Sequence, residues 1–499
     1  MMKKAKKMVA AMMALVLTLA MNITVFAAPG NGTFSVTIKD AEKGHTYEAY
    51  QVFSGELSED GTKLSNISWG EGISKEGQEA LGDAAAYAQK LSEEGTSAEA
   101  EAAVIGEYLT TATASSSDAK EADGKYTYVI NNLPAGYYLI KDADGSLAGT
   151  EGAYSSYILQ VVKNVEVEPK ADVASVSKFV KDTNDSTGDT TDWQKSADYD
   201  EGDAVPFRLV ATMPSNIDDY AAYRLVFHDT LSAGLTYTDG DAFTVTIGDS
   251  VVEGFTKTVT QNDDGTTAVE FACDDIKALG SVTAGTTVAV EYTAVLNDKA
   301  VTGAAGNNNE VFLEFSNNPN KTGAGETGTT PKDQAVVFTY KVVINKVDQN
   351  NQPLAGAEFT LYKMVNGEKN AVTTATVSSE GTTFEFLRLD DGEYVLEETK
   401  TPDGYNSIPE VAFTIVADHA NTALTLDALT ANQTSEGTTM VRFAENLAEG
   451  ALATDVMNAQ GATLPSTGGA GTVAIYTIAI VLILGAALIL ITRKRVGKK

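Results

Sequence analysis

The fold class is decided by a stretch that reads Val288-Ala289-Val290-Glu291-Tyr292-Thr293-Ala294-Val295-Leu296. Similar short runs, rich in Val, Thr, Tyr and Phe, recur at 33–38, 154–162 and 336–343, and turns of Gly, Asp and Asn separate them. Short β-prone runs with regular turn signals are typical of sandwiches. The sequence therefore predicts an all-β protein of tandem immunoglobulin-like β-sandwich domains.

Working outward from these runs, we expect three domains, at residues 28–170, 171–335 and 336–460. Residues 169–172 and the Gly/Thr-rich stretch 317–328 indicate linkers. Residues 44–50 resemble residues 356–362, so the first and third domains should share a topology. The exception to the β pattern is the Ala- and Glu-rich stretch 77–110, which predicts one or two helices inserted in a connection of the first domain.

Composition excludes several functional classes. The net charge of −32 argues against nucleic-acid binding. The single cysteine, Cys273, permits no intramolecular disulfide, and no His/Cys spacing suited to zinc accompanies the three histidines. We therefore expect no cofactor and no metal site.

The N-terminal segment has the three parts of a secretory signal. Four lysines lie within the first seven residues, an apolar run follows from Met8 to about Val25, and small residues end at Ala27. This order predicts a signal peptide over residues 1–27 and a secreted protein. A membrane anchor at this end is the alternative.

The C-terminal segment also has three parts. It contains Leu464-Pro465-Ser466-Thr467-Gly468, then the uncharged stretch 472–491, which is long enough to span a bilayer, and then a basic tail. This order resembles the LPXTG sorting signal (464–499) that sortases read. The resemblance implies that a sortase cysteine attacks the Thr467 carbonyl, releases Gly468 onward and leads to cell-wall anchoring on peptidoglycan. The chain would be the substrate of that chemistry, and the enzyme another protein.

Charged side chains occupy inward positions of several predicted strands. Side chains alternate between the two faces of a strand. In the third domain, a lysine, an acid and an amide share the parity of apolar neighbours: Lys346, Glu398 and Asn458. In the middle domain the corresponding set is Lys178, Asp229 and Asn309, with Asn307 as the other candidate amide.

Burial makes such groups reactive. An unpaired buried charge costs several kcal/mol, and desolvation lowers the pKa of a lysine and raises that of a carboxyl. A neutral amine in contact with an amide can attack its carbonyl carbon, with loss of ammonia, to form an isopeptide bond. The alternative is a strand-edge lysine whose ammonium reaches water beside an ordinary ion pair.

Three motifs carry a family resemblance. The segment 394–405 looks like the pilin E-box, and 345–359 is similar to the opening of Cna-B-type domains. The segments 227–231 and 309–317 resemble the middle domain of SpaA-type major pilins. The resemblance implies autocatalytic bonds between Lys346 and Asn458 under Glu398, and between Lys178 and Asn309 under Asp229.

The first domain departs from this pattern. Asp40 falls where the repeat would place the reactive lysine, and Lys39 points to the other face, so we expect no isopeptide bond there. The segment 165–170 resembles the pilin motif in which a lysine follows a proline at a strand end. Lys170 has outward parity, as a polymerising lysine needs, although Glu168 and Ala171 replace the family's usual Tyr and Asn. A plain linker lysine is the alternative.

Together these features predict the structural backbone subunit of a covalent pilus. The expected partners are a class C-like sortase, a housekeeping sortase, other copies of the chain, peptidoglycan, accessory pilins and a host surface ligand. A monomeric wall-anchored adhesin of the same domains is the alternative. An enzyme is not expected, because no Ser/His/Asp, zinc or glycosidase arrangement stands out.

Overall fold

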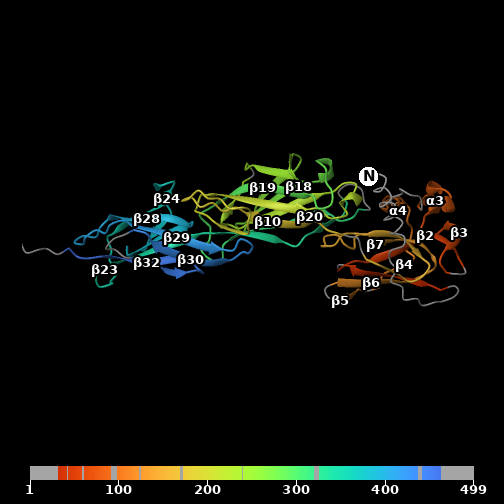
Figure 1. Ribbon diagram of the computed structural model, residues 1–499, viewed down its shortest axis with the longest axis horizontal. Helices are drawn as coiled ribbons and strands as arrows, with labels where there is room; N and C mark the ends of the chain where they lie inside the picture. The colour runs from red at the N-terminus through yellow and green to blue at the C-terminus, as the bar shows by residue number, and fades with distance from the viewer. Residues whose placement is uncertain are drawn as a thin grey trace, which may run out of the picture.

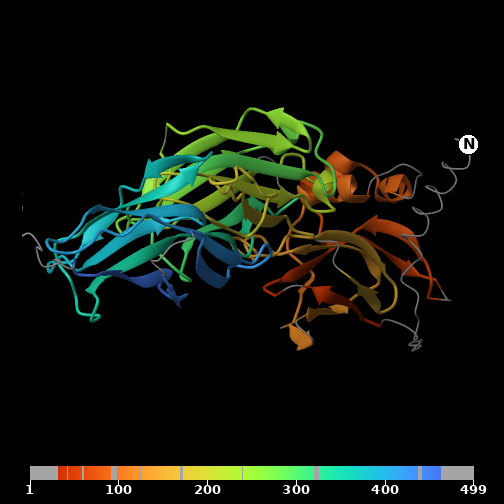
Figure 2. The same cartoon turned by 60° about the vertical axis from the view of Figure 1, so that its left-hand side comes forward.

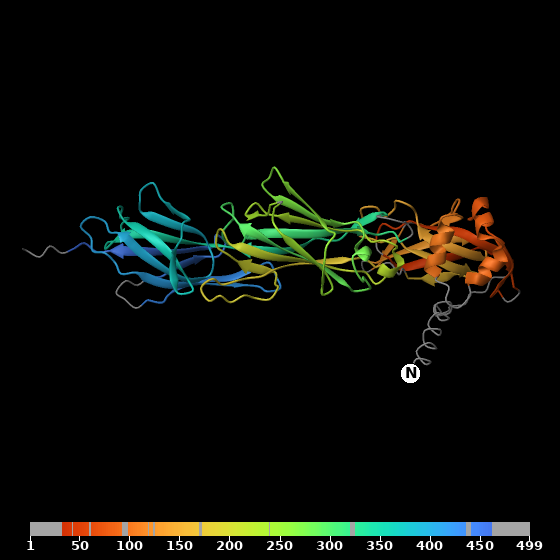
Figure 3. The same cartoon turned by 90° about the horizontal axis from the view of Figure 1, so that it is seen from above.

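The computed structural model describes residues 32–461, apart from residues 42, 59–60, 92–97, 118, 123–124, 169–171, 239, 320–324 and 436–440. In this part the chain forms three β-sandwiches that follow one another in a row (Figure 1). The turned views show the same order, with the α-helices gathered on the first sandwich (Figures 2 and 3). The predicted all-β class and the tandem arrangement are confirmed.

The first sandwich packs a four-stranded sheet against a five-stranded one. The four-stranded sheet has the order β5 (Lys120–Ala122), β6 (Lys125–Leu133), β1 (Phe34–Ala41) and β9 (Val165–Val167). The other sheet has the order β3 (Leu64–Trp69), β2 (Tyr47–Leu57), β7 (Gly136–Asp142) and β8 (Ser156–Val161), with β4 (Ala114–Ser115) paired to β2.

Three short helices decorate the first sandwich, where the sequence predicted one or two. They are α2 (Lys75–Leu81), α3 (Ala84–Leu91) and α4 (Ala98–Gly106). Ser74 begins α2 because its hydroxyl accepts the Gly77 amide at 3.0 Å, and Gly82 ends it with a φ of +83°. The Ala-rich pattern predicted helical structure correctly but did not reveal this break.

The middle sandwich is the largest. Its six-stranded sheet has the order β10 (Ser175–Val180), β12 (Ala204–Thr212), β19 (Thr287–Leu296), β15 (Phe243–Ile247) and β16 (Ser250–Val252), with β14 (Leu235–Thr236) paired to β19. Its seven-stranded sheet has the order β11 (Ser196–Asp198), β22 (Asp333–Phe338), β20 (Asn307–Ser316), β13 (Leu225–Leu231), β18 (Thr267–Cys273) and β17 (Thr256–Gln261), with β21 (Thr327–Thr329) paired to β20.

The third sandwich packs two five-stranded sheets. One has the order β26 (Ala375–Val377), β27 (Thr383–Leu389), β23 (Tyr340–Asp348), β32 (Ala451–Asn458) and β31 (Ala444–Asn446). The other has the order β25 (Glu368–Ala371), β24 (Glu358–Val365), β28 (Gly392–Lys400), β29 (Val411–His419) and β30 (Leu426–Gln433). The first and last strands of this domain, β23 and β32, lie side by side and run parallel.

The middle and third sandwiches are joined without a linker. Strand β22 ends at Phe338 and β23 begins at Tyr340, so β22 crosses the expected boundary after residue 335. Val336 and Phe338 pack into the core of the third domain, and Thr339 between the strands is fully buried. The stretch 317–328, expected to be a linker, instead connects β20 to β21 within one sheet.

Candidate functional site

The third domain contains a buried lysine on its central strand. Val342, Ile344 and Lys346 follow one another on the inward face of β23, and each is 0% exposed. The Lys346 Nζ donates to the Asn458 Oδ1 at 2.6 Å and to the Val456 carbonyl oxygen at 2.9 Å. Because β23 and β32 are parallel neighbours, the contact joins the first and last strands of the domain.

Glu398 completes this site from the opposite sheet. Its side chain, on β28, is fully buried, and its Oε1 accepts the Asn458 Nδ2 at 2.7 Å and lies 3.9 Å from the Lys346 Nζ. Its Oε2 accepts the Thr401 hydroxyl at 3.1 Å and the Ile408 amide at 3.3 Å, which orients the carboxyl group. Burial lowers the pKa of Lys346 to about 8, against the attraction of Glu398. The amine is therefore partly neutral at physiological pH.

The middle domain contains a second buried lysine, on its edge strand β10. Lys178 is 0% exposed, and its Nζ pairs with the Asp229 Oδ1 and lies 3.5 Å from the Tyr292 hydroxyl. The Tyr292 hydroxyl donates to the Asp229 Oδ2 and accepts the Asn309 Nδ2 at 2.7 Å. Lys178 comes from one sheet, and Asp229 and Asn309 come from the other. A bond between the lysine and the asparagine would thus join the two sheets.

Burial sets the charge states of this second site. It lowers the pKa of Lys178 to about 8, although Asp229 attracts its charge. It raises the pKa of Asp229, against the opposing effect of Lys178, and raises that of Tyr292 well above its ordinary value. The tyrosine therefore stays protonated as a neutral bridge.

The two candidate amides of the middle domain have different surroundings. The Asn309 side chain contacts Tyr292, and its Oδ1 is buried without a hydrogen-bond partner. The Asn307 amide is fully engaged, since its Nδ2 donates to the Val301 and Val337 carbonyl oxygens and its Oδ1 accepts the Val301 amide. This geometry favours Asn309 as the acceptor.

Sequence reasoning missed two residues of importance. Tyr292 shares the inward parity of Val288 and Val290 on β19, and a buried tyrosine hydroxyl usually has a polar partner, so its position carried a signal. Lys363 likewise shares the parity of Leu361 on β24 and is only 4% exposed. Burial alone would lower the pKa of Lys363, but Asp390, Asp200 and Asp185 outweigh it and raise that pKa above its ordinary value. Lys363 thus remains a charged ammonium, whereas the other two buried lysines are partly neutral at physiological pH.

The remaining predicted residues lie at the surface or outside the described part of the chain. Lys39 pairs with Glu166 at 2.6 Å, and its side chain is 45% exposed. Lys170, the sorting motif 464–468 and the signal peptide fall outside the described residues. Among the residues that are described, no helix is long and apolar enough to cross a membrane.

Comparisons with known proteins agree with this architecture. Residues 340–430 match the family model of the SpaA prealbumin-like fold domain. Residues 201–319 match the model of Gram-positive pilin backbone subunit 2, a Cna-B-like domain. The Cna-B-like match thus falls on the middle sandwich, and the prealbumin-like match falls on the third.

Proteins that are similar to this chain over most of its length include solved backbone pilins. The trypsin-resistant surface T6 protein of Streptococcus pyogenes is 23% identical over 94% of this chain and 96% of its own length. The solved T6 backbone pilin of S. pyogenes shares the fold with a TM-score of 0.54, at 17% identity, over 87% of this chain and 100% of that one. The major pilin SpaD of Corynebacterium diphtheriae has a TM-score of 0.50 at 18% identity, over 88% and 100% of the two chains. By its two matched domains and its end-to-end similarity to these proteins, the chain is similar to the backbone pilins of Gram-positive bacteria.

Proposed function

We propose that this chain is the structural backbone subunit of a sortase-polymerised covalent pilus, in which two internal Lys–Asn isopeptide bonds stabilise each subunit. The observation that carries the proposal is the fully buried Lys346, whose Nζ lies 2.6 Å from the Asn458 side chain beneath the carboxyl group of Glu398. Burial favours the neutral, nucleophilic form of this amine and holds it in contact with the amide that it would attack.

The proposed reaction balances without any other reagent. The neutral Lys346 amine attacks the Asn458 Cγ, the Cγ–Nδ2 bond breaks, and a C–N bond to the Lys346 Nζ forms. Glu398 takes the proton that the amine loses and delivers it to the leaving Nδ2, which departs as ammonia. Its 2.7 Å contact with that nitrogen places it for this transfer. In the middle domain, Asp229 has the same role for Lys178, through the bridging Tyr292 hydroxyl.

The positions of the two bonds suit a filament under tension. The chain enters the third sandwich on β23 and leaves it on β32, so a bond between residues 346 and 458 carries load directly between these strands. In the middle domain the bond connects the entry strand β10 with β20 in the facing sheet. The three sandwiches in a row give the subunit the form of a rod (Figure 1).

Polymerisation would join Lys170 of one subunit to Thr467 of the next. Lys170 lies in the segment between β9 and β10, and Thr467 follows the third sandwich. Such a head-to-tail contact does not close on itself and therefore produces a filament. The last subunit would be transferred to peptidoglycan by the housekeeping sortase.

The polymer is tested by expressing the full chain together with its sortases and boiling wall extracts in denaturant. The wild type should give a ladder of covalent multimers. The control Lys163→Ala changes an exposed lysine seven positions before Lys170 and should give the same ladder. Lys170→Ala should give the monomer alone. A ladder that persists in Lys170→Ala would exclude this lysine as the donor. A single wall-bound species in the wild type would instead favour the monomeric adhesin.

A further inference from the structure

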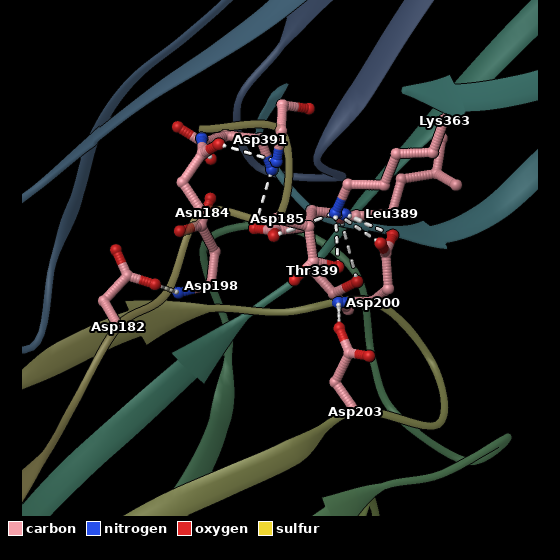
Figure 4. A network of polar contacts seen from close by, with 12 residues as sticks. Asp182, Asn184, Asp185, Asp198, Asp200, Asp203, Thr339, Lys363, Leu389 and Asp391 are labelled. Atoms are coloured by element: carbon pink, nitrogen blue, oxygen red, sulfur yellow. Dashed lines mark hydrogen bonds and ion pairs between the residues drawn. The ribbon is translucent and has the colours of Figure 1, made fainter. Parts of the chain in front are cut away.

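The junction between the middle and third sandwiches gathers acidic side chains from distant segments (Figure 4). Asp198 ends β11 of the middle sandwich, and Asp390 and Asp391 form the turn between β27 and β28 of the third. Asp198 is 1% exposed and Asp390 is 0% exposed. Buried carboxylates need a compensating charge, so each cation at the junction can be assigned to the acids that it serves.

Lys363 compensates one side of the cluster. Its Nζ lies 3.0 Å from the Asp390 Oδ2 and 3.4 Å from the Asp185 Oδ2, and it also pairs with the Asp200 Oδ2. The Asp200 Oδ1 accepts the Asp390 amide at 2.8 Å, which fixes the turn against the middle sandwich. The ammonium is therefore shared among three acids.

His419 compensates a second side. Its Nε2 lies 3.3 Å from the Asp198 Oδ1 and 3.6 Å from the Asp182 Oδ2. The His419 ring thus serves Asp182 and one oxygen of Asp198.

A third group of acids is left under-compensated. Asp198, Asp390 and Asp391 each offer a carboxylate oxygen, and these oxygens lie within 4.8 Å of one another. The Asp198 Oδ2 is buried, and among the described residues no cation or amide donates to it; the Tyr340 hydroxyl is the group beside it. The Asp390 Oδ1 accepts the Asp391 amide at 2.8 Å, and the Asp391 Oδ1 accepts the Asn184 side chain, and neither contact brings a positive charge to Asp391. A neutral hydroxyl could supply a hydrogen bond to this group but no charge.

We propose that the carboxylates of Asp198, Asp390 and Asp391 bind one hard divalent cation, calcium, which bridges the middle and third sandwiches. Calcium prefers six to eight oxygen ligands, and water can complete the shell around three carboxylates. One carboxylate comes from the middle domain and two from the third, so the ion would lock the angle between them. The Asn184 side chain, which donates to the Asp391 Oδ1, holds that carboxyl group in place.

The test is calorimetric titration of Ca²⁺ into the ectodomain, residues 28–463, after treatment with a chelator. Calcium sites in extracellular modules have dissociation constants of about 10⁻⁴ to 10⁻³ M, so the titration extends to about 10 mM. We expect one site in the wild type, at least tenfold weaker binding in Asp198→Asn and Asp391→Asn, and unchanged binding in Asp189→Asn. Asp189 is an exposed acid of the neighbouring loop and is the matched control.

Three outcomes would overturn the site. The wild type would show no saturable Ca²⁺ uptake, or both Asn variants would bind Ca²⁺ as tightly as the wild type, or the wild type would bind Mg²⁺ more tightly than Ca²⁺. Terbium luminescence provides a measurement on the wild type alone, should the variants fold poorly. Tb³⁺ at this position should be sensitised by the buried ring of Tyr340 and displaced by Ca²⁺, and a dark complex would also contradict the proposal.

Discussion

Replacement of Glu398 by alanine isolates the chemistry of one bond. Each Lys–Asn bond removes one ammonia, so the wild-type ectodomain should be about 34 Da lighter than its sequence mass, or about 17 Da for each bond. Glu398→Ala should retain only the deficit of the middle domain, about 17 Da by the same stoichiometry. The amine itself is not impaired, because the attraction of Glu398 holds the pKa of Lys346 up and its loss leaves the amine more neutral. The missing bond would therefore report the proton transfer that Glu398 performs.

The loss of stability can be estimated from the loop that the bond closes. Residues 346 and 458 are 112 positions apart. By the chain-entropy argument used for disulfides, a cross-link over a loop of roughly 100 residues stabilises by about 4.7 kcal/mol. In a domain of this size that corresponds to a melting temperature lower by roughly 15 °C in Glu398→Ala. Differential scanning calorimetry should show the transition of the third domain shifted and that of the middle domain in place.

The matched control is Glu397→Ala, which removes the same charge from the adjacent position of β28. Glu397 is not part of the buried site, so this variant should keep both mass deficits. Intact-mass spectrometry, with identification of the branched peptide after digestion, decides the outcome. The reasoning would be refuted by a wild type at its full sequence mass, or by a Glu398→Ala protein that still lacks two ammonias.

Two further predictions concern the other buried groups. Tyr292→Phe removes the hydroxyl that bridges Asp229 and Asn309. Bond formation in the middle domain should therefore slow by about 100-fold, the usual effect of losing a positioned proton-transfer group. Intact mass during refolding follows the rate, and an unchanged rate would show that the bridge is only structural. Lys363→Met should leave both mass deficits intact, because that lysine is charged and faces only carboxylates, yet it should cost about 3–5 kcal/mol in urea unfolding by leaving buried acids unpaired. A mass change in Lys363→Met would contradict the assignment of this residue as an ion-pair partner.

The local pattern of the sequence determined which groups point inward. Strand side chains alternate with a period of two, so the apolar neighbours of Lys346 on β23 and of Lys178 on β10 place both amines in the core. The same rule placed Asp229 with Phe227 and Leu231 on the inner face of β13. Periodicity is a property of each strand alone, and it therefore required no knowledge of the neighbouring strands.

Which of these groups meet depends on how the strands pair and how the sheets pack. Sheet pairing brings Asn458 beside Lys346, and the facing sheet supplies Glu398. The packing of β19 inserts the Tyr292 hydroxyl between Asp229 and the Asn309 amide. The Asn307 amide instead donates to backbone carbonyl oxygens. These distances depend on strand order and on the spacing between sheets, neither of which a single strand encodes.

The junction between the middle and third domains could not be predicted from the pattern of any single strand. Its acids lie at the end of β11 and in a loop of the middle domain, and in a turn of the third, and Asp390 pairs with a lysine of β24. These segments share no periodicity and no motif. Each alone resembles an ordinary solvated Asp-rich turn. Their burial arises because β22 runs into β23 with one residue between them, which presses the two domains together and removes water from the acids. Strand periodicity alone thus revealed the two inward-pointing lysines, Lys178 and Lys346. Docking of the domains sets where charge is concentrated, because desolvation depends on every segment that covers a group.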